Sequence, residues 1–289
     1  MNIEVSVIIP VFNKEVYLGD CLNSVLNQSF NALEVICIDD ASEDISGDIL
    51  QNFENRDARL RVIKNNENLG AGMSRNIGIE AAKGKFLRFV DADDLLPHDS
   101  IEKLHDRAIE AAADLVKGSL AIFCDDNPSV YREVISVQDK MRTQLSNEEE
   151  LWIPWWHTSY LISSDLVHKH NLRYPDLIAG EDPVFLTSVL INAEHLSFIE
   201  DIVYLYRKYQ KASGSDGTTI GHATDFLKHA ATTKELLTSY NHDCWHHGYG
   251  PSLLNDMQYF LSRFEFTTPQ QQYINAELTK IWRNQTFNA

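Results

Sequence analysis

Two almost uninterrupted apolar runs near the N-terminus constrain the fold of this chain more than any other feature. Residues 5–12 read VSVIIPVF and residues 33–40 read LEVICIDD, without the strict alternation of a strand that has one wet face. Residues 17–28 lie between them and carry apolar side chains at helical spacing. Buried strands joined by a helix are typical of a parallel sheet covered by helices on both faces. We therefore predict an α/β fold.

The same alternation of strand and helix patterns continues through the first half of the chain. Further strands are expected at residues 61–65, 86–90 and 115–123, and further helices at residues 72–82 and 99–112. Asp99 and Glu102 have the spacing of a capping box at the start of the last of these helices. The polar stretch at residues 125–150 reads as an excursion or lid outside the core.

The second half has a different texture. We expect a short helix at residues 164–170, a helix after Glu181-Asp182-Pro183 and a strand at residues 203–207. A Gly/Ser/Thr-rich loop at residues 210–221 and mostly helices beyond it should follow. The sequence therefore predicts a division after residue 221, with an α/β domain at residues 1–221 and a helical C-terminal region at residues 222–289.

Charge and hydropathy narrow the function classes. Among 289 residues, 42 acidic side chains against 25 basic ones give a net charge of −17, which disfavours general nucleic-acid binding. A phosphate-bearing ligand would therefore need a local cation. No apolar run approaches the roughly 20 residues of a membrane span, and the chain opens on a strand-like segment, so the cytoplasm is the expected compartment. The four cysteines show no CxxC pair, and we expect no disulfide framework.

Carboxylates stand where two of the predicted strands end. Asp39 and Asp40 end the second strand, and Asp91, Asp93 and Asp94 follow the fourth. In a doubly wound sheet, ligands bind beyond the carboxyl ends of the strands. Alternation along an extended chain puts Asp91 and Asp93 on one side, where they can share Mn²⁺ or Mg²⁺ that also binds substrate phosphates. A polar turn before a helix is the simpler explanation of an isolated Asp-rich segment.

Two nucleotide-binding motifs are absent from the sequence. The turn after the first strand reads Pro10-Val11-Phe12-Asn13-Lys14 and lacks GxGxxG, and no GxxxxGK[ST] occurs. A dinucleotide-binding fold is therefore disfavoured. The same turn argues against a sugar-phosphate nucleotidylyltransferase, which would need a glycine-rich phosphate loop there.

Three segments, taken in order, resemble the inverting family 2 glycosyltransferases of the GT-A fold. They read VSVIIPVFNKEVYLGDCLNSVLNQSF, EVICIDDAS and NLGAGMSRNIGIEAAKGKFLRFVDADD. The resemblance is strong over residues 3–120, extends through Gly180-Glu181-Asp182 and fades after about residue 215. It implies a Rossmann-like, mostly parallel sheet flanked by helices, with residues 1–221 as the nucleotide-sugar-binding and catalytic domain.

The resemblance also implies the reaction and its partners. A sugar would pass with inversion from a UDP-sugar to a saccharide or lipid-linked saccharide, in bacterial polysaccharide or lipopolysaccharide synthesis, with Mn²⁺ or Mg²⁺ as cofactor. The alternative is a catalytically silent sugar-binding subunit of the same fold. Peripheral association with the inner face of the membrane and oligomerisation stay open.

Individual roles follow from the same resemblance. The implied donor-binding residues are Pro10, Val11, Phe12, Asp40, Arg75, Asp91, Ala92 and Asp93, with Asp40 accepting from the uracil ring. Asp91 and Asp93 would bind the metal, Asp93 more directly. Asp182 would be the catalytic base, and Trp155, Trp156 and Glu181 would contact the acceptor.

Simpler explanations exist for several of these residues. Arg75 could be a surface helical residue paired with Glu80 or another acid. Asp182 could merely cap a helix, as Asp before Pro often does. Trp155 and Trp156 could form a buried aromatic hinge rather than stack on sugar rings. In addition, Arg207, Lys208 and Lys211 form a basic cluster that either meets the diphosphate or is a solvated turn.

Overall fold

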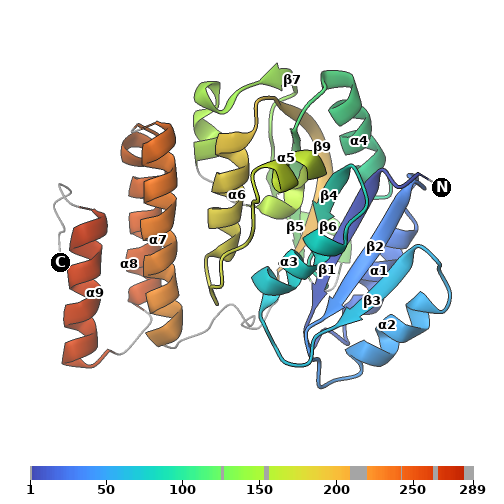
Figure 1. Ribbon diagram of the computed structural model, residues 1–289, viewed down its shortest axis with the longest axis horizontal. Coiled ribbons are helices and arrows are strands. Elements are labelled where there is room, and N and C mark those ends of the chain that lie inside the picture. Colours follow the sequence, from blue (N-terminus) through green and yellow to red (C-terminus); the bar gives the residue numbers. More distant parts are fainter. Residues whose placement is uncertain are drawn as a thin grey trace. The chain divides into compact units, whose positions relative to one another are not determined.

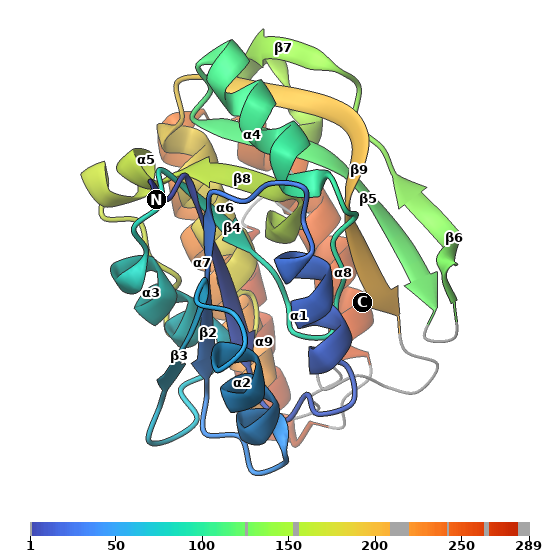
Figure 2. The ribbon, with the colours of Figure 1, turned by 90° about the vertical axis from the view of Figure 1, so that its right-hand side faces the viewer.

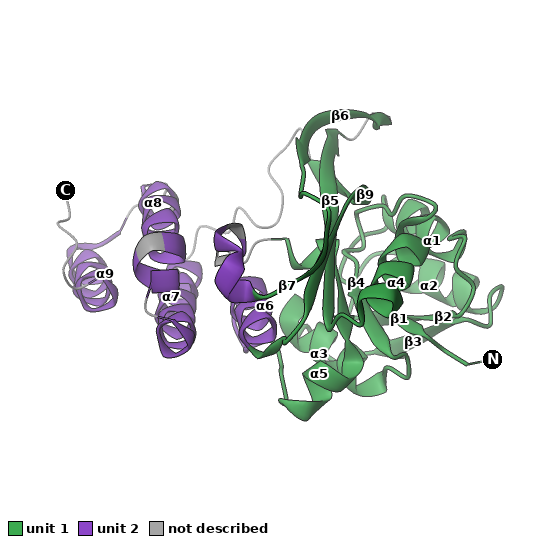
Figure 3. Ribbon diagram, turned by 90° about the horizontal axis from the view of Figure 1, so that it is seen from above, with its two compact units in different colours: residues 1–144, 156–174, 192–211 green, residues 145–155, 175–191, 212–289 purple. Residues whose placement is uncertain are grey.

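The computed structural model describes residues 2–124, 127–152, 156–208, 220–241, 243–262 and 266–282. The chain forms two compact units (Figure 3). Unit 1 comprises Met1–Gln144, Trp156–Tyr174 and Asn192–Lys211, and unit 2 comprises Leu145–Trp155, Pro175–Ile191 and Ala212–Ala289. The segments of the two units alternate along the chain, whereas the sequence suggested a single division after residue 221. The predicted division into domains at residues 1–221 and 222–289 stays a prediction.

Unit 1 contains one mixed sheet. Within the described residues its nine strands are β1 (Val5–Val11), β2 (Leu33–Asp39), β3 (Leu60–Lys64), β4 (Phe86–Phe89), β5 (Leu115–Cys124), β6 (Asn127–Ile135), β7 (Lys140–Thr143), β8 (Tyr160–Ser163) and β9 (Leu196–Lys208). Their order is β3-β2-β1-β4-β8-β5-β9-β7, with β6 beside β5.

The first four strands form the parallel half of the sheet. β1 pairs in parallel with both β2 and β4, and β2 pairs in parallel with β3. β1 and β2 are fully buried apart from Pro10, as their apolar sequences predict. The predicted α/β class, a sheet flanked by helices, is confirmed.

The second half of the sheet departs from the sequence-based expectation. β8 lies antiparallel between β4 and β5, and no strand was predicted there. β9 begins at Leu196, seven residues before the predicted strand, and pairs in parallel with β5 across a β-bulge. The stretch at 125–150 was predicted to lie outside the core structure, which is wrong in part, because β6 and β7 extend the sheet.

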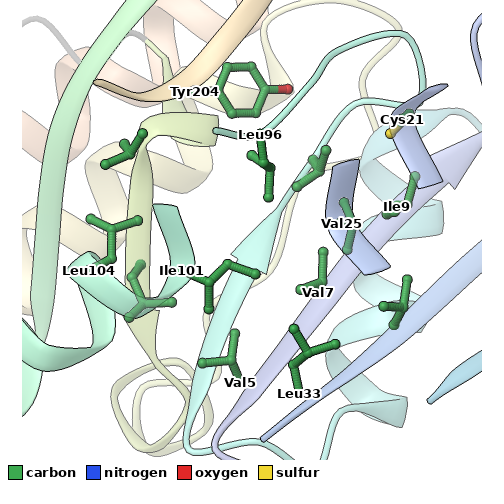
Figure 4. Packing of buried hydrophobic residues seen from close by; sticks show 14 of the residues in the cluster. Val5, Val7, Ile9, Cys21, Val25, Leu33, Leu96, Ile101, Leu104 and Tyr204 are labelled. Atoms are coloured by element: carbon green, nitrogen blue, oxygen red, sulfur yellow. The ribbon is translucent and has the colours of Figure 1, made fainter. Parts of the chain in front are cut away.

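Within the described residues, five helices of unit 1 accompany the sheet. They are α1 (Leu18–Leu26), α2 (Ser46–Glu54), α3 (Ala71–Ala81), α4 (Ser100–Ala111) and α5 (Ser164–Lys169). Figure 2 shows α1 and α3 on opposite sides of β1 and β2. On the α1 side, Val5, Val7 and Ile9 of β1 pack with Cys21, Val25, Ile101 and Leu104 in one buried cluster (Figure 4). On the α3 side, a methyl group at Gly78 would lie 2.3 Å from Ile8 Cγ2, so only glycine allows this close approach.

The predicted capping box at α4 does not form. Asp99 is the N-cap residue, but its side chain makes no capping hydrogen bond. Its carboxylate instead pairs with Lys103 at 2.8 Å, and Ser29 donates to Glu102 at 2.7 Å. The carboxylates of Asp99 and Glu102 therefore bind these other partners and do not form the hydrogen bonds of a capping box.

Unit 2 is helical in its described part (Figure 1). It contains most of α6 (Glu181–Asn192), then α7 (Ile220–Tyr240), a π-helical segment (Cys244–Tyr249), α8 (Gly250–Leu261) and α9 (Thr268–Ile281). α7 packs against both α8 and α9. The predicted helical C-terminal region is thus confirmed. Within the described ranges, no helix is both long enough and apolar enough to cross a membrane.

Candidate active site

The strand order of the parallel half switches direction beside β1. The chain moves from β1 to β2 and β3 on one side, and then returns to place β4 on the other. Ligands of open α/β sheets bind at such a point, beyond the carboxyl ends of the two diverging strands. The turn after β1 and the acidic turn after β4 both lie at this edge. The predicted convergence of polar groups there is consistent with the topology.

Each of the two aspartates proposed as metal ligands is paired with a cation. Lys14, in the turn after β1, forms an ion pair with Asp93. Arg75 of α3 donates from Nη2 to Asp91 Oδ1 at 2.7 Å. The Arg75 side chain is 4% exposed and the Asp93 side chain 14%, so solvent screens these charges only partly. The edge therefore combines both signs of charge in a small space.

Arg75 is not a surface residue. It is buried and pairs with an acid, Asp91, whereas Glu80 pairs with Arg173. The role of Arg75 at the donor stays a prediction. The neighbouring Asn76 donates to the Tyr174 carbonyl at 2.8 Å and accepts from the Tyr174 amide at 2.9 Å. The Arg75 guanidinium also lies 5.3 Å from the centre of the Tyr174 ring. These contacts orient Arg75 toward the acidic turn.

Lys14 contacts the acidic turn, and sequence reasoning did not single it out. It follows Phe12 in the turn just beyond β1, whereas Pro10 belongs to the strand, and its position after a strand end was the available signal. The backbone of this turn is fixed, because the Lys14 amide donates to Ser46 Oγ at 2.9 Å. Asn13, at a left-handed φ of 52°, accepts from the Glu43 amide at 2.8 Å.

The third aspartate of the turn has a different task. Asp94 is 1% exposed, accepts from Tyr204 Oη at 2.7 Å and from the Arg207 amide at 2.7 Å. Tyr204 Oη in turn accepts from the Asp91 amide at 3.1 Å. Burial, followed by the charges of Asp91 and Asp93, raises the pKa of Asp94 well above its ordinary value. Asp94 thus connects the acidic turn to the end of β9.

Arg207 also contacts this acidic turn. Its guanidinium lies 4.6 Å from the centre of the Tyr17 ring and 4.8 Å from that of Phe123, and Nε donates to the Asp93 carbonyl at 2.6 Å. Arg207 is 5% exposed, so it is not part of a solvated basic turn. Lys208 is exposed, and Lys211 lies outside the described residues.

Asp40 organises the loop between β3 and α3. Its Oδ1 accepts from Asn65 Nδ2 at 2.7 Å and from the Leu69 amide at 2.9 Å, and its Oδ2 accepts from the Gly70 amide at 2.8 Å. A carboxylate has about four acceptor positions, so the carboxylate is nearly saturated by the protein itself. The role of Asp40 at the uracil ring stays a prediction.

The remaining donor-side residues differ in what they can offer a ligand. Val11 is fully buried and Ala92 is 2% exposed, so a ligand would meet their backbone rather than their side chains. Pro10 is half-buried. Phe12, just beyond β1, is 40% exposed, so its apolar ring is accessible to a ligand.

An aromatic pair lies close to the acidic turn. Trp156, at a left-handed φ of 62°, meets the Tyr206 ring edge-on with 5.0 Å between centroids. Burial, followed by the charges of Asp94, Asp91 and Asp93, raises the pKa of Tyr206 to about 12. This influence indicates that Tyr206 of β9 lies near the turn. Trp155 lies outside the described residues.

Glu181 and Asp182 belong to unit 2. They occupy the first turn of α6, with Pro183 behind them, as predicted. Gly180, immediately before them, has a φ of +85°, which favours glycine. A helix N-terminus favours negative charge, so this is a suitable position for an ionised carboxylate.

The donor set suits a hard divalent cation. Asp91 and Asp93 offer carboxylate oxygens, and each already holds a positive group of the protein. Mg²⁺ and Mn²⁺ sites often use one or two carboxylates and complete the shell with water and substrate phosphates. Among the described residues no cluster of three or more His, Cys, Asp or Glu could hold a metal. The role of Asp91 and Asp93 as metal ligands stays a prediction.

Comparison with known protein families gives a match over more than half of the chain. The family described as "Glycosyl transferase family 2" matches residues 6–164. The chain is 30% identical over 210 residues to the uncharacterized glycosyltransferase EpsJ of Bacillus subtilis strain 168, covering 71% of this chain and 61% of EpsJ. It is 29% identical over 217 residues to the poly(ribitol-phosphate) beta-glucosyltransferase of Bacillus spizizenii, covering 70% of this chain and 32% of that enzyme.

Solved structures share the fold. S. aureus TarS in complex with UDP-GlcNAc aligns with a TM-score of 0.76 at 19% identity, covering 96% of this chain and 80% of TarS. The mannosyltransferase PcManGT from Pyrobaculum calidifontis, in complex with GDP-Man and Mn²⁺, aligns with a TM-score of 0.63 at 17% identity, covering 99% of this chain and 89% of that one. The predicted GT-A fold is thereby confirmed.

Proposed function

Because the chain belongs to glycosyl transferase family 2 and is a glycosyltransferase, we propose that it moves a sugar from a UDP-sugar donor, with inversion, onto a saccharide or lipid-linked saccharide. The observation that carries this proposal is the acidic turn after β4, where Asp91 and Asp93 each meet a basic side chain. A nucleoside diphosphate needs positive charge beside it. This edge supplies two basic side chains in fixed positions, and its two carboxylates could bind a metal cation as a third positive charge.

The assignment of UDP as the donor nucleotide rests on the side chains near the ends of β1, β2 and β4, and on the solved structure of TarS. UDP would place its base near Phe12 and Asp40 and its diphosphate near Lys14 and Arg75. A buried guanidinium is well suited to phosphate oxygens because it presents a planar fork of N–H donors. The UDP-GlcNAc in complex with TarS supports a uridine nucleotide, whereas the PcManGT structure holds GDP-Man.

The reaction itself is a single displacement. An acceptor hydroxyl oxygen bonds to the anomeric carbon while the bond from that carbon to the diphosphate oxygen breaks, which inverts the configuration. Asp182 takes the hydroxyl proton, and UDP leaves with the bonding electrons. Lys14 and Arg75 would stabilise the negative charge that develops on the diphosphate.

A divalent metal at Asp91 and Asp93 would add positive charge at the same diphosphate when bound. Mn²⁺ in the PcManGT structure supports such a cofactor. Asp94 is excluded from this set by its engagement with Tyr204 and Arg207.

Relatives suggest the acceptor class. The Bacillus spizizenii enzyme acts, by its name, on poly(ribitol phosphate). We place this chain in bacterial surface polysaccharide synthesis, with lipopolysaccharide as one form. Trp156 and Glu181 are proposed to contact the acceptor. Residues 1–221 are proposed to form the catalytic domain. The protein is proposed to act in the cytoplasm, at the inner face of the membrane.

The nucleotide proposal can be tested by thermal unfolding. UDP is expected to raise the melting temperature with Mn²⁺ or Mg²⁺ and much less with chelator, because without a metal Asp91 and Asp93 neutralise Arg75 and Lys14. Asp93→Ala should remove the metal dependence. Asp94→Ala should lower the melting temperature of the protein alone while leaving the metal dependence in place. Equal stabilisation by UDP with and without chelator would argue against the metal.

The catalytic proposal is tested by turnover of UDP-glucose, UDP-galactose, UDP-N-acetylglucosamine and UDP-N-acetylgalactosamine, followed as UDP release. Asp182→Asn keeps a polar side chain of the same size in the first turn of α6 but removes the base, so turnover should fall by about 10²-fold or more while UDP affinity is retained. Near wild-type turnover would mean that another residue is the base, and Glu181 would be the next candidate to test. Metal-dependent UDP binding without turnover of any donor or acceptor would favour the silent sugar-binding subunit.

A further inference from the structure

The turn that precedes Asp182 is held by side chains from the C-terminal helical region. Asp225 of α7 accepts from the Ile178 amide at 2.9 Å. The carboxylate is largely buried, with 11% of its side chain exposed, and its other oxygen accepts from Lys228 at 2.8 Å. Residues more than 40 positions apart in sequence are therefore joined within unit 2, four residues before the proposed base.

His229, one helical turn further along α7, lies directly against Gly180. A methyl group at Gly180 would stand 2.6 Å from His229 Nδ1 and 2.7 Å from its Cβ. Contacts this short leave no room for any side chain at Gly180, whose φ of +85° already disfavours one. The backbone of the turn and the imidazole ring thus form one tightly packed layer.

The imidazole is itself fixed from the other side. His229 is fully buried, and its Nε2 lies 2.9 Å from Tyr249 Oη, in the π-helical segment. The Phe226 ring lies 5.2 Å from it, centre to centre. A ring held by packing and by a hydrogen bond can act as a rigid support, because its rotamer cannot change without opening the core.

We propose that α7 positions the catalytic base: Asp225 and His229 hold the backbone of residues 178–180 so that the first turn of α6 presents Asp182 in one orientation. The inference rests on the proposed role of Asp182. It gives the C-terminal helices a part in the reaction without any contact to the nucleotide. Both residues are positioning residues, since they act through the backbone that carries Asp182.

The physical reason is the sensitivity of proton transfer to geometry. A displacement of about 1 Å at a reacting group can cost roughly 10²-fold in rate. Gly180 is conformationally permissive, and without support on this side the turn would sample other orientations. The hydrogen bond at Ile178 and the packing at Gly180 restrict it at two points, two residues apart.

The test compares three single variants of the full chain, using the UDP-sugar that the wild type turns over fastest. Asp225→Ala should lower kcat by about tenfold or more, with little change in the donor KM or in UDP binding with Mn²⁺. Asp225→Asn keeps an acceptor for the Ile178 amide and should recover most of kcat. Lys228→Met is the matched control, because it removes the exposed partner of Asp225 and leaves the turn contact intact.

A double-mutant cycle separates positioning from general loss of stability. If Asp225 acts through Asp182, then Asp225→Ala should cost almost nothing more in kcat in an Asp182→Asn background. The same fold loss in both backgrounds would overturn the inference. If Asp225→Ala does not fold, Asp225→Glu tests the same point, since it keeps the charge and displaces the acceptor oxygen.

The two proposals fail in different ways. Full activity of Asp182→Asn removes the base assignment itself. An inactive Asp182→Asn together with wild-type kcat in Asp225→Ala and in His229→Gln leaves the base in place and overturns its positioning by α7.

Discussion

We expect Lys14 and a divalent cation to compete for the carboxylate of Asp93. Lys14 forms an ion pair with Asp93, so a metal that binds this carboxylate must displace the ammonium group. We predict that Lys14→Met raises the affinity of the nucleotide-free protein for Mn²⁺, by about tenfold, because the metal no longer displaces an ammonium. Titration of Mn²⁺ followed by electron paramagnetic resonance measures this directly.

The control for that experiment is a lysine away from the turn that also pairs with a carboxylate. Lys85 pairs with Glu4 at 3.0 Å, and Lys85→Met should leave Mn²⁺ binding unchanged. Identical Mn²⁺ affinities in Lys14→Met and the wild type would mean that the cation does not bind at Asp93. UDP affinity should fall in Lys14→Met, since the diphosphate loses a cation.

His229 makes stability depend on pH. Burial lowers the pKa of His229 from 6.5 to about 3, so the unfolded chain binds this proton more readily than the folded one. The stabilisation is complete above about pH 6.5 and is lost as pH falls toward about 3. We predict that His229→Gln shows a smaller loss of unfolding free energy between pH 7.5 and 5 than the wild type, by up to about 1.4 kcal/mol per pH unit.

Urea unfolding at several pH values measures this difference. The other histidines are common to both proteins, so the difference between the two curves belongs to position 229. Parallel curves would show that His229 is solvated or paired in a way that keeps its ordinary pKa.

The loop between β3 and α3 depends on one glycine. Gly70 has φ +86° and ψ 160°, a region that is essentially restricted to glycine, and its amide donates to Asp40. Gly70→Ala should therefore cost on the order of 1–3 kcal/mol of stability or rearrange the loop. Because the proposed nucleoside site includes Asp40, UDP binding should weaken in the same variant.

Gly19 of α1 is the matched control. A methyl group meets no atom within 4 Å at either glycine, so only the backbone conformation distinguishes the two sites. Gly19→Ala lies within a helix and should be neutral or stabilising by up to about 1 kcal/mol. Isothermal calorimetry with UDP and Mn²⁺ provides the comparison. Equal UDP affinity in both variants would show that the loop held by Asp40 has no part in nucleotide binding.

The parallel half of the sheet was predictable because its information is local. Strands such as β1 and β2 are almost wholly apolar, are separated by an amphipathic helix, and need no partner to be recognised. β8 has only four residues, and its position between β4 and β5 depends on pairings about 45 and 75 residues away in sequence. No local periodicity encodes such a partner.

The candidate site divides in the same way. The acidic turn was visible in sequence because several carboxylates follow one strand, but the pairing of Asp91 with Arg75 and of Asp93 with Lys14 required the topology. The different task of Asp94 depends on Tyr204, 110 residues away, and could not be predicted from the DADD sequence alone. The support of Gly180 by α7 is non-local for the same reason.

The division of labour within the molecule leads to a prediction for the whole chain. The groups proposed to bind UDP belong to unit 1, whereas Asp182 and the helices α7, α8 and α9 belong to unit 2. Hydrogen exchange on the full chain, measured by mass spectrometry, reports where a ligand suppresses opening. UDP with Mn²⁺ should increase protection in the turns after β1 and β4 and in the loop at residues 65–70. Protection in α7 to α9 should change little, because a nucleotide held by unit 1 adds no interaction to their opening. Strong protection of α7 by UDP alone would place the C-terminal helices at the nucleotide and contradict a role confined to the base and the acceptor.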